Sequence, residues 1–425
     1  MISDPIELRI TSLAAGGDGL GRLEDGRVVF VTGGVPGDLV QLADLTLGKR
    51  LAHANVGRVL EASPDRTAAR CRHFGSCGGC AWQHIRYPAQ LDAKRGIVRD
   101  ALERIGGIQL EVEVEILESP DPYNYRARAR LVESSTGIGY RKRGSRECID
   151  IEECPILVSS AQSKLREMIS LRRANSDGDA APTTVPRRRA TPEWEILAGS
   201  DGTVEAHRVG ARGGLVSKKR IKIEVLGERL EASGGSFVQG NALLWDALAG
   251  EVRRQCLMPA ADSDFAPGED RNASPRIVEL FAGIGFLTLP LARAGCRGVV
   301  FESGRAALRD LSRNLGRAGL AGEIEVIGGR VEQRGDWASR FAAADLLLLD
   351  PPRTGLDSVL REAVAKVGPP RIVYVSCDPA TLARDLREFL AQGYELKTLK
   401  ALDLFPQTSH VEVVARLERN RSNAD

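Results

Sequence analysis

Residues 277–285 have the sequence IVELFAGIG, a short apolar run that leads directly into two glycines. A run of this composition is typical of a buried strand, and the glycines allow the tight turn that follows it. After Pro275 four more apolar runs alternate with segments of helical periodicity: 298–301, 324–327, 346–349 and 372–375. This alternation predicts a doubly wound α/β domain with a parallel sheet.

In such sheets ligands bind beyond the carboxyl ends of the strands. The glycines or polar residues at those ends are Gly283, Gly285, Glu302, Asp350 and Cys377. A carboxylate such as Glu302 is suited to ribose hydroxyls, so the pattern indicates a nucleoside-containing cofactor. NAD is the alternative, but its fingerprint requires a third glycine where this chain has Thr288. S-adenosylmethionine has no pyrophosphate to bind and is favoured.

Cys377 lies in the stretch 373–379, VYVSCDP, where a strand is expected to end on a thiol. Asp378 and Pro379 are typical of a helix N-cap followed by proline in the first turn. Thiols react as thiolates, and a helix N-terminus lowers a thiol pKa, although the adjacent Asp378 opposes this effect. Cys377 is therefore a candidate nucleophile, and a buried structural cysteine is the alternative.

The chain of 425 residues is 43% hydrophobic and 27% charged, which is ordinary for a globular protein of two or three domains. Its net charge of +2 means that any nucleic-acid surface must be a local patch. The N-terminal residues lack a basic and apolar leader, and no apolar run is long enough to cross a bilayer. We expect a cytoplasmic protein, in which the eight cysteines serve as metal ligands, catalysts or core residues.

Residues 6–60 contain short alternating runs that are broken by glycine-rich turns. They predict a small, OB-like antiparallel β-barrel, a fold that commonly binds single-stranded nucleic acid. Basic residues decorate it at Arg9, Arg22, Arg27, Lys49, Arg50 and Arg58. A solvated barrel surface is the alternative interpretation.

Three cysteines follow within ten residues, and a fourth candidate precedes a proline: Cys71, Cys77, Cys80 and Cys154. Four thiolates suit either zinc or an iron–sulfur cluster. Structural zinc sites usually contain two Cys-x2-Cys pairs, and only one is present here, so the spacing favours the cluster. Cys148 is the competing fourth ligand.

Arg126, Arg128 and Arg130 alternate along a predicted strand and should share one face. Such a row suits RNA phosphates, and the alternative is pairing with the acidic residues of 111–118. Residues 173–192 lack periodicity and are expected to form a mobile insertion. The amphipathic segment 242–255 is expected to be a helix that links two domains.

Several motifs in combination resemble those of the uracil-C5 RNA methyltransferases. They are FVQ at 237–239, the glycine turn, DPPR at 350–353, SCDP at 376–379 and FPQTSHVE at 405–412. The sequence is most similar to the TRAM-containing, iron–sulfur branch that acts on 23S ribosomal RNA. The resemblance implies a TRAM-like barrel (1–62), an α+β central domain with a [4Fe-4S] cluster (63–258), a Rossmann-like class I methyltransferase domain (259–418) and a tail (419–425).

The resemblance also implies roles for individual residues. Cofactor contacts fall on Gln239, Phe281, Glu302 and Asp350, and cluster ligands on Cys71, Cys77, Cys80 and Cys154. The nucleophile falls on Cys377 and the general base on Glu412, with His410 a weaker candidate for the base. Phe286 and Arg330 depart from the residues that relatives often carry there.

Carbon 5 of uracil is a poor nucleophile, so addition of the Cys377 thiolate at carbon 6 would activate it for methyl transfer. Glu412 would then remove the proton from carbon 5 and allow the thiolate to leave. The target base must be flipped out of folded RNA to reach the thiol. We expect a monomer that binds 23S rRNA and no membrane; the alternatives are transfer RNA as substrate, or an iron–sulfur RNA-binding protein without methyl transfer.

Overall fold

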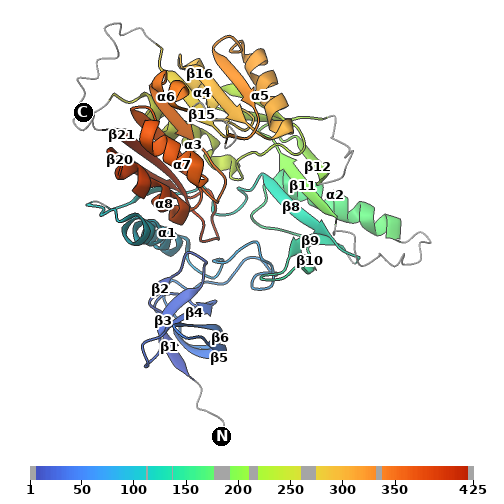
Figure 1. Ribbon diagram of the computed structural model, residues 1–425. Helices are drawn as coiled ribbons and strands as arrows, with labels where there is room; N and C mark the ends of the chain where they lie inside the picture. The colour runs from blue at the N-terminus through green and yellow to red at the C-terminus, as the bar shows by residue number, and fades with distance from the viewer. Residues whose placement is uncertain are drawn as a thin grey trace.

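The computed structural model describes residues 6–111, 113–135, 137–176, 192–209, 219–259, 274–331 and 337–419. In Figure 1 an N-terminal sheet lies at the bottom, a central region at the right and a large C-terminal sheet above them. The predicted insertion at 173–192 lies mostly outside the described residues, and its first part, 173–176, continues a helix.

The N-terminal sheet has the strand order β1-β5-β6-β4-β3-β2. Its strands are β1 (Glu7–Arg9), β2 (Ser12–Leu13), β3 (Gly19–Arg22), β4 (Val28–Thr32), β5 (Leu39–Leu47) and β6 (Leu51–Glu61). The edge strands β1 and β2 are consecutive in the chain, so the sheet curls until its two edges meet. Alternate residues such as Val29, Val31 and Val40 fill its interior.

The central region contains a five-stranded antiparallel sheet with the order β10-β9-β8-β11-β12. Its strands are β8 (Arg128–Glu133), β9 (Ile138–Arg141), β10 (Cys148–Asp150), β11 (Glu193–Ala198) and β12 (Val204–Val209). Helix α2 (Ser159–Ser176) packs on β11 and β12. Helix α1 (Tyr87–Ala101) precedes this sheet and continues into a π-helical turn, η1 (Leu102–Gly106). The region ends with the hairpin of β13 (Ile221–Val225) and β14 (Glu228–Ala232).

The C-terminal sheet has eight strands in the order β17-β16-β15-β18-β19-β21-β20-β7. The strands are β7 (Glu115–Leu117), β15 (Arg276–Leu280), β16 (Arg297–Glu302), β17 (Ile324–Gly328), β18 (Leu346–Leu349), β19 (Arg371–Ser376), β20 (Tyr394–Leu402) and β21 (Glu412–Arg419). Strands β15 to β19 are mutually parallel as predicted, whereas β21 runs antiparallel to β19 and β20.

Helices cover both faces of this sheet. One face holds η2 (Ala242–Leu244), α3 (Trp245–Leu257), α4 (Thr288–Arg293) and α5 (Arg305–Ala318), and the other holds α1, α6 (Trp337–Ala342), α7 (Ser358–Val367) and α8 (Pro379–Leu390). Alternate strand residues divide between the two cores, so Val373 faces α3 while Ile372 and Tyr374 face α8. The doubly wound α/β prediction is therefore confirmed.

Two elements of the central region belong physically to the C-terminal sheet. Strand β7 pairs in parallel with β20 at its edge, and α1 packs against α8. Among the described helices, none combines the length and the apolar composition needed to cross a bilayer.

Candidate active site and four-cysteine site

Cys377 lies one residue beyond the carboxyl end of β19 and is followed by Asp378, the N-cap of α8. The Asp378 carboxylate accepts hydrogen bonds from the N–H groups of Ala380 and Thr381, both at 3.0 Å, and Pro379 is the first helical residue. The predicted strand, N-cap and helix start are confirmed. The turn fixes Cys377 between a rigid strand and a rigid helix, with its side chain half-buried.

Glu412 is brought to Cys377 by the antiparallel register of β19 and β21. Ser376, the last residue of β19, lies opposite Val413, so the same register continued by one residue brings Cys377 opposite Glu412. On its other side Glu412 pairs with Leu402 of β20. Glu412 is only 2% exposed, so this carboxyl group points into protein rather than into solvent. The two residues predicted to carry the chemistry are therefore neighbours.

The four predicted cofactor residues cluster at the same end of the sheet. Both oxygens of Glu302 are held by main-chain N–H groups, Oε2 by Gly283 at 2.8 Å and Oε1 by Gly304. Gln239 Nε2 donates to Asp350 Oδ2 at 3.5 Å. Phe281 follows β15 with a φ of +67°, a strained conformation for a residue with a side chain. A turn held in this way is typical of a ligand site.

The active-site acids and thiol are electrostatically perturbed. Burial, followed by the nearby Glu412 carboxylate, raises the pKa of the Cys377 thiol to about 12, while Arg353 acts in the opposite direction. Burial raises the pKa of Asp350 to about 7 and holds the pKa of Glu412 well above its usual range. Burial therefore disfavours the ionised forms of both the Cys377 thiol and the Glu412 carboxyl in the unliganded site.

His410, the weaker candidate for the base, is less suited to accept a proton. Burial, assisted by the positive charge of Arg353, lowers its pKa to about 4. Its ring packs edge-on against Phe405 with centroids 6.0 Å apart.

Two charged residues at this edge were not assigned a role from the sequence. Glu279 lies inside β15, accepts a hydrogen bond from Thr288 Oγ1 at 2.7 Å, and has its pKa raised to about 8 by burial. Arg353 is the cation that acts on Cys377, Glu412 and His410. Arg353 belongs to the DPPR motif, and this motif was the sequence signal that could have identified it as an active-site residue. The two positions that depart from the family are Phe286, which is buried in the core, and Arg330, which is exposed after β17.

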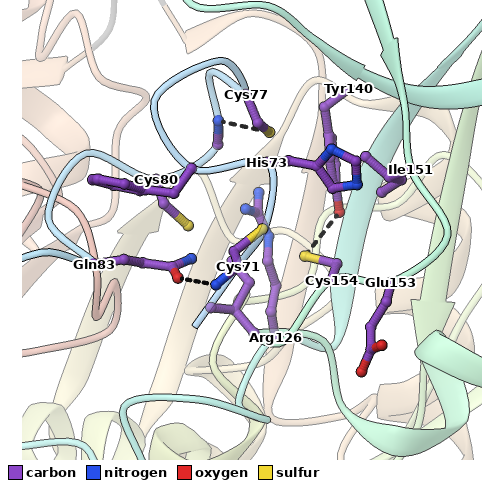
Figure 2. A pocket seen from close by; sticks show the side chains of 13 residues that line it. Cys71, His73, Cys77, Cys80, Gln83, Arg126, Tyr140, Ile151, Glu153 and Cys154 are labelled. Atoms are coloured by element: carbon purple, nitrogen blue, oxygen red, sulfur yellow. Dashed lines mark hydrogen bonds between the residues drawn. The ribbon is translucent and has the colours of Figure 1, made fainter. Parts of the chain in front are cut away.

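The other four predicted cysteines converge on one cavity. Cys71, Cys77, Cys80 and Cys154 all line it, together with Arg126, Tyr140 and apolar side chains. Figure 2 shows their sulfur atoms surrounding the same space, three from the 71–80 loop and one from the segment before α2. Cys148 does not line the cavity and instead lies on β10, with its thiol 3.5 Å from the Val132 carbonyl oxygen.

Hydrogen bonds hold three of the four cysteines in place. The Gly79 N–H points at Cys77 Sγ at 3.4 Å, and the Tyr140 hydroxyl lies 3.8 Å from Cys154 Sγ. Main-chain N–H groups of two cysteines donate to glutamine side chains, Cys71 to Gln83 at 3.0 Å and Cys154 to Gln162 at 2.8 Å. Burial raises the pKa of the Cys80 thiol to about 12. Within the described residues, no three His, Cys, Asp or Glu side chains are close enough to hold a single metal ion.

The arginine row divides among different surroundings. Arg126 lines the cysteine cavity, whereas Arg128 forms an ion pair with Glu195 at 2.5 Å. Arg130 lies 3.8 Å from Glu193 and has a largely exposed side chain. The acidic partners therefore come from β11, and the alternative that named residues 111–118 is wrong. On the N-terminal sheet, Arg9 pairs with Glu61 at 2.5 Å.

Residues 338–420 match the family model described as tRNA (Uracil-5-)-methyltransferase. The chain is 34% identical to the 23S rRNA (uracil(1939)-C(5))-methyltransferase RlmD of Halomonas elongata, over 97% of this chain and 89% of that protein. It is 32% identical to an uncharacterized RNA methyltransferase of Gloeobacter violaceus, over 98% of this chain and 96% of the relative.

A solved structure has the same fold over nearly the whole chain. It is the Pyrococcus abyssi tRNA (uracil-54, C5)-methyltransferase in complex with S-adenosyl-L-homocysteine. The match covers 97% of this chain and 100% of that chain, with a TM-score of 0.68 and 24% identity.

Proposed function

Because the chain belongs to the RNA (uracil-C5)-methyltransferase family, and is thus an S-adenosylmethionine-dependent enzyme, we propose that it methylates a uridine of 23S rRNA through a covalent Cys377 adduct. The ribosomal substrate is supported by relatives named for 23S rRNA at 31% and 34% identity over 97% of this chain. The alternative substrate is transfer RNA, for which the family model and the solved structure are named.

The observation that carries the proposed mechanism is the register that sets Cys377 opposite a buried Glu412. The Cys377 thiolate adds to carbon 6 of uracil, and the electron pair of the 5,6 double bond becomes an enolate with its nucleophilic end at carbon 5. Carbon 5 would take the methyl group from the sulfonium sulfur of the cofactor, which would be left as a neutral sulfide. Glu412 then takes the proton from carbon 5, the carbon–sulfur bond to Cys377 breaks, and the double bond re-forms. The addition at carbon 6 and the later elimination therefore require only the Cys377 thiolate and the Glu412 carboxylate from the protein.

Both groups act in their ionised forms, and their raised pKa values disfavour these forms in the unliganded site. S-adenosylmethionine supplies the methyl group on a positively charged sulfonium. A positive charge next to these buried groups favours their ionised forms. We infer that Arg353, the protein cation that lowers both pKa values, contributes in the same direction.

The residues at the strand ends fit such a cofactor. Glu302, fixed by the N–H groups of Gly283 and Gly304, is suited to accept hydrogen bonds from ribose hydroxyls. Gln239 and Asp350, which contact each other, are suited to polar groups of the cofactor, and Phe281 offers an aromatic ring beside them. We propose these four residues as the cofactor site.

The four-cysteine cavity fits an iron–sulfur cluster better than a single ion. Four thiols line one cavity, whereas no three ligands in the described part of the chain are close enough for one metal ion. A [4Fe-4S] cluster takes four thiolate ligands, which matches the four cysteines that line this cavity. Arg126 and the Gly79 N–H would then stabilise the negative charge on sulfur. Cys71, Cys77, Cys80 and Cys154 are the proposed ligands, and the cluster's role is to fix the central region.

The curled N-terminal sheet is proposed as a TRAM-like RNA-binding barrel, whose RNA would approach the flipped uridine at Cys377. The predicted domain boundaries, the monomeric state and the cytoplasmic location remain predictions.

The substrate class is tested by incubating the enzyme with tritiated S-adenosylmethionine and transcripts of 23S rRNA and of transfer RNA, followed by nucleoside analysis. We expect 5-methyluridine in the ribosomal transcript only. Labelling of transfer RNA alone would show that the proposed ribosomal substrate is wrong, but it would agree with the proposed reaction. Labelled cytidine or adenosine in place of uridine would overturn the proposed reaction.

A further inference from the structure

The connection between β20 and β21, residues 403–411, leads directly into Glu412. It joins Leu402 to the residue that pairs with it across the hairpin, Glu412 itself. Any displacement of this hairpin connection therefore moves the carboxyl group relative to Cys377. Its apolar residues Leu404 and Val411 pack into the cores of the C-terminal sheet, but most of its hydrogen bonds to other segments are made with parts of the chain outside that sheet.

Gln407, near the middle of the hairpin connection, is bound by α1 through a reciprocal pair of hydrogen bonds. Gln90 Oε1 accepts from the Gln407 N–H at 2.9 Å, and Gln90 Nε2 donates to Gln407 Oε1 at 3.1 Å. Gln90 Nε2 also donates to the carbonyl oxygen of Ile85 at 2.8 Å. Both glutamines are buried. Such a pair fixes both the backbone and the side chain of Gln407.

The segment that follows Cys80 binds the remaining main-chain group of Gln407. The N–H groups of Ala81 and Trp82 both donate to the Gln407 carbonyl oxygen, at 2.9 and 3.0 Å. Gln407 has a φ of +68°, a conformation that a residue with a side chain adopts at a cost in energy. The surrounding contacts hold it there, as is common at functional sites.

Three further contacts fix the hairpin connection on both sides of Gln407. Lys94 of α1 and Asp403 form an ion pair in which both side chains are fully buried. The Tyr125 hydroxyl donates to the Pro406 carbonyl oxygen at 2.8 Å, and Ser409 Oγ donates to the Ala15 carbonyl oxygen at 2.5 Å. The hairpin connection is thus anchored by α1, by Tyr125 and the segment after Cys80, and by the turn between β2 and β3 of the N-terminal sheet.

We propose that Gln407 is a positioning residue for Glu412, through which α1 and the segment after Cys80 set the carboxyl group at the distance that removal of the carbon-5 proton requires. The proposal rests on the proposed function of Glu412 as base. General-base catalysis depends on placement within hydrogen-bonding reach, so a small displacement should slow proton removal. Thiolate addition depends on Cys377, which β19 and α8 hold independently of the hairpin connection.

The test is Gln90→Leu, which removes both side-chain hydrogen bonds to Gln407 without changing the hairpin connection. The matched control is Gln255→Leu, because Gln255 is also a buried glutamine that joins a helix to β20, through Thr398 Oγ1 at 2.7 Å, but lies away from Glu412. Each protein is mixed with cofactor and the RNA transcript, and the covalent RNA adduct is followed over time on denaturing gels.

For Gln90→Leu we expect adduct formation within about threefold of wild type and adduct breakdown slowed by about tenfold or more, so that the adduct accumulates. Gln255→Leu should form and resolve the adduct as wild type does. Breakdown at the wild-type rate in Gln90→Leu would overturn the proposal. The proposal would also be overturned if both variants lost cofactor affinity and slowed adduct formation and adduct breakdown to the same extent, because that pattern is typical of a general folding defect.

If Gln90→Leu does not fold, Gln407→Gly serves instead, because glycine accepts the positive φ but removes the side-chain hydrogen bond to Gln90 and makes the connection more flexible at this position. Accumulated adduct supports the proposal, and normal breakdown contradicts it. Failure of the wild-type enzyme to form any adduct would contradict the proposed function itself, which keeps the two outcomes distinct.

Discussion

The two cysteine sites of this protein differ in what surrounds the sulfur atoms. Around Cys71, Cys77, Cys80 and Cys154 lie a main-chain N–H, a tyrosine hydroxyl and the guanidinium of Arg126. Around Cys377 lie the carboxyl groups of Glu412, Asp350 and Asp378, opposed by Arg353. Burial raises the pKa of both Cys80 and Cys377 to about 12. In the first site the surrounding donors would stabilise thiolates once a metal cluster is bound, whereas in the second the carboxyl groups disfavour the thiolate until a further positive charge arrives. The neighbouring groups therefore distinguish the proposed ligand cysteines from the proposed nucleophile.

The largest effect should follow from removing the sulfur of Cys377. Cys377→Ala should lower methyl incorporation into RNA by at least about 1000-fold, because no other group at the strand ends can add to carbon 6. Cys148→Ala, which removes a thiol outside both sites, should retain activity within about twofold. Substantial methylation by Cys377→Ala would contradict the contrast between the two cysteine sites, because Cys377 would then be a structural cysteine and not the nucleophile.

Cys80→Ser should abolish iron binding, whereas Cys148→Ser should retain it. Cys80 is one of the four cavity-lining cysteines and Cys148 is not. Iron and sulfide analysis and the visible absorption of anaerobically purified protein provide the measurement. Equal iron content in both variants would contradict the proposed ligand set. Because Ala81 and Trp82 bind Gln407, we also expect the Cys80→Ser adduct to resolve more slowly than that of Cys148→Ser.

The pH dependence of Cys377 alkylation sharpens the contrast in charge. A thiol pKa of about 12 keeps the thiolate a minor form, so the rate in cofactor-free protein should rise about tenfold for each pH unit between about pH 7 and 10. Mass spectrometry of the Cys377 peptide after iodoacetamide treatment measures this rate. A plateau near pH 8 would show an ordinary thiol pKa.

Cofactor charge can be separated from cofactor bulk in the same assay. S-adenosylmethionine carries a positive sulfonium and S-adenosylhomocysteine a neutral sulfide, while both occupy similar space. We expect faster alkylation at pH 7 with the charged cofactor than with the neutral one. Equal rates would indicate that cofactor charge does not activate Cys377.

A smaller effect is expected on stability. The pKa of Asp350 is raised from 3.8 to about 7, so the folded state retains a proton that the unfolded state loses. This destabilises the fold progressively as pH rises from about 4 to 7, on the order of a few kcal/mol in total, and is constant above pH 7. Asp350→Asn should therefore raise the melting temperature more at pH 8 than at pH 5. An equal shift at both values would show that Asp350 titrates normally.

Much of the C-terminal region was predictable because its signals are local. The alternating apolar runs predicted β15, β16, β17, β18 and β19, and the Asp378-Pro379 pair predicted the start of α8. The sequence named Cys154 as the fourth candidate and left Cys148 as its competitor, the family resemblance implied Cys154, and Cys154 is the one that lines the cavity.

The contacts that cross the molecule were not predictable. Neither Gln90 nor Lys94 stands in a motif, and their partners, Gln407 and Asp403, lie more than 300 residues away in the chain. Strand β7 is too short to show a period of its own, and it is recognised only by its pairing with β20. The arginine row was predicted to share one face, but its acidic partners on β11 depended on tertiary pairing.

The most direct test of the mechanism is the intact mass of Glu412→Gln after incubation with S-adenosylmethionine and the ribosomal transcript, compared with wild type. We predict an adduct in which methylated RNA is attached through Cys377 and which persists in the variant but turns over in wild type. A variant that releases 5-methyluridine at the wild-type rate, with no adduct, would contradict the assignment of Cys377 and Glu412.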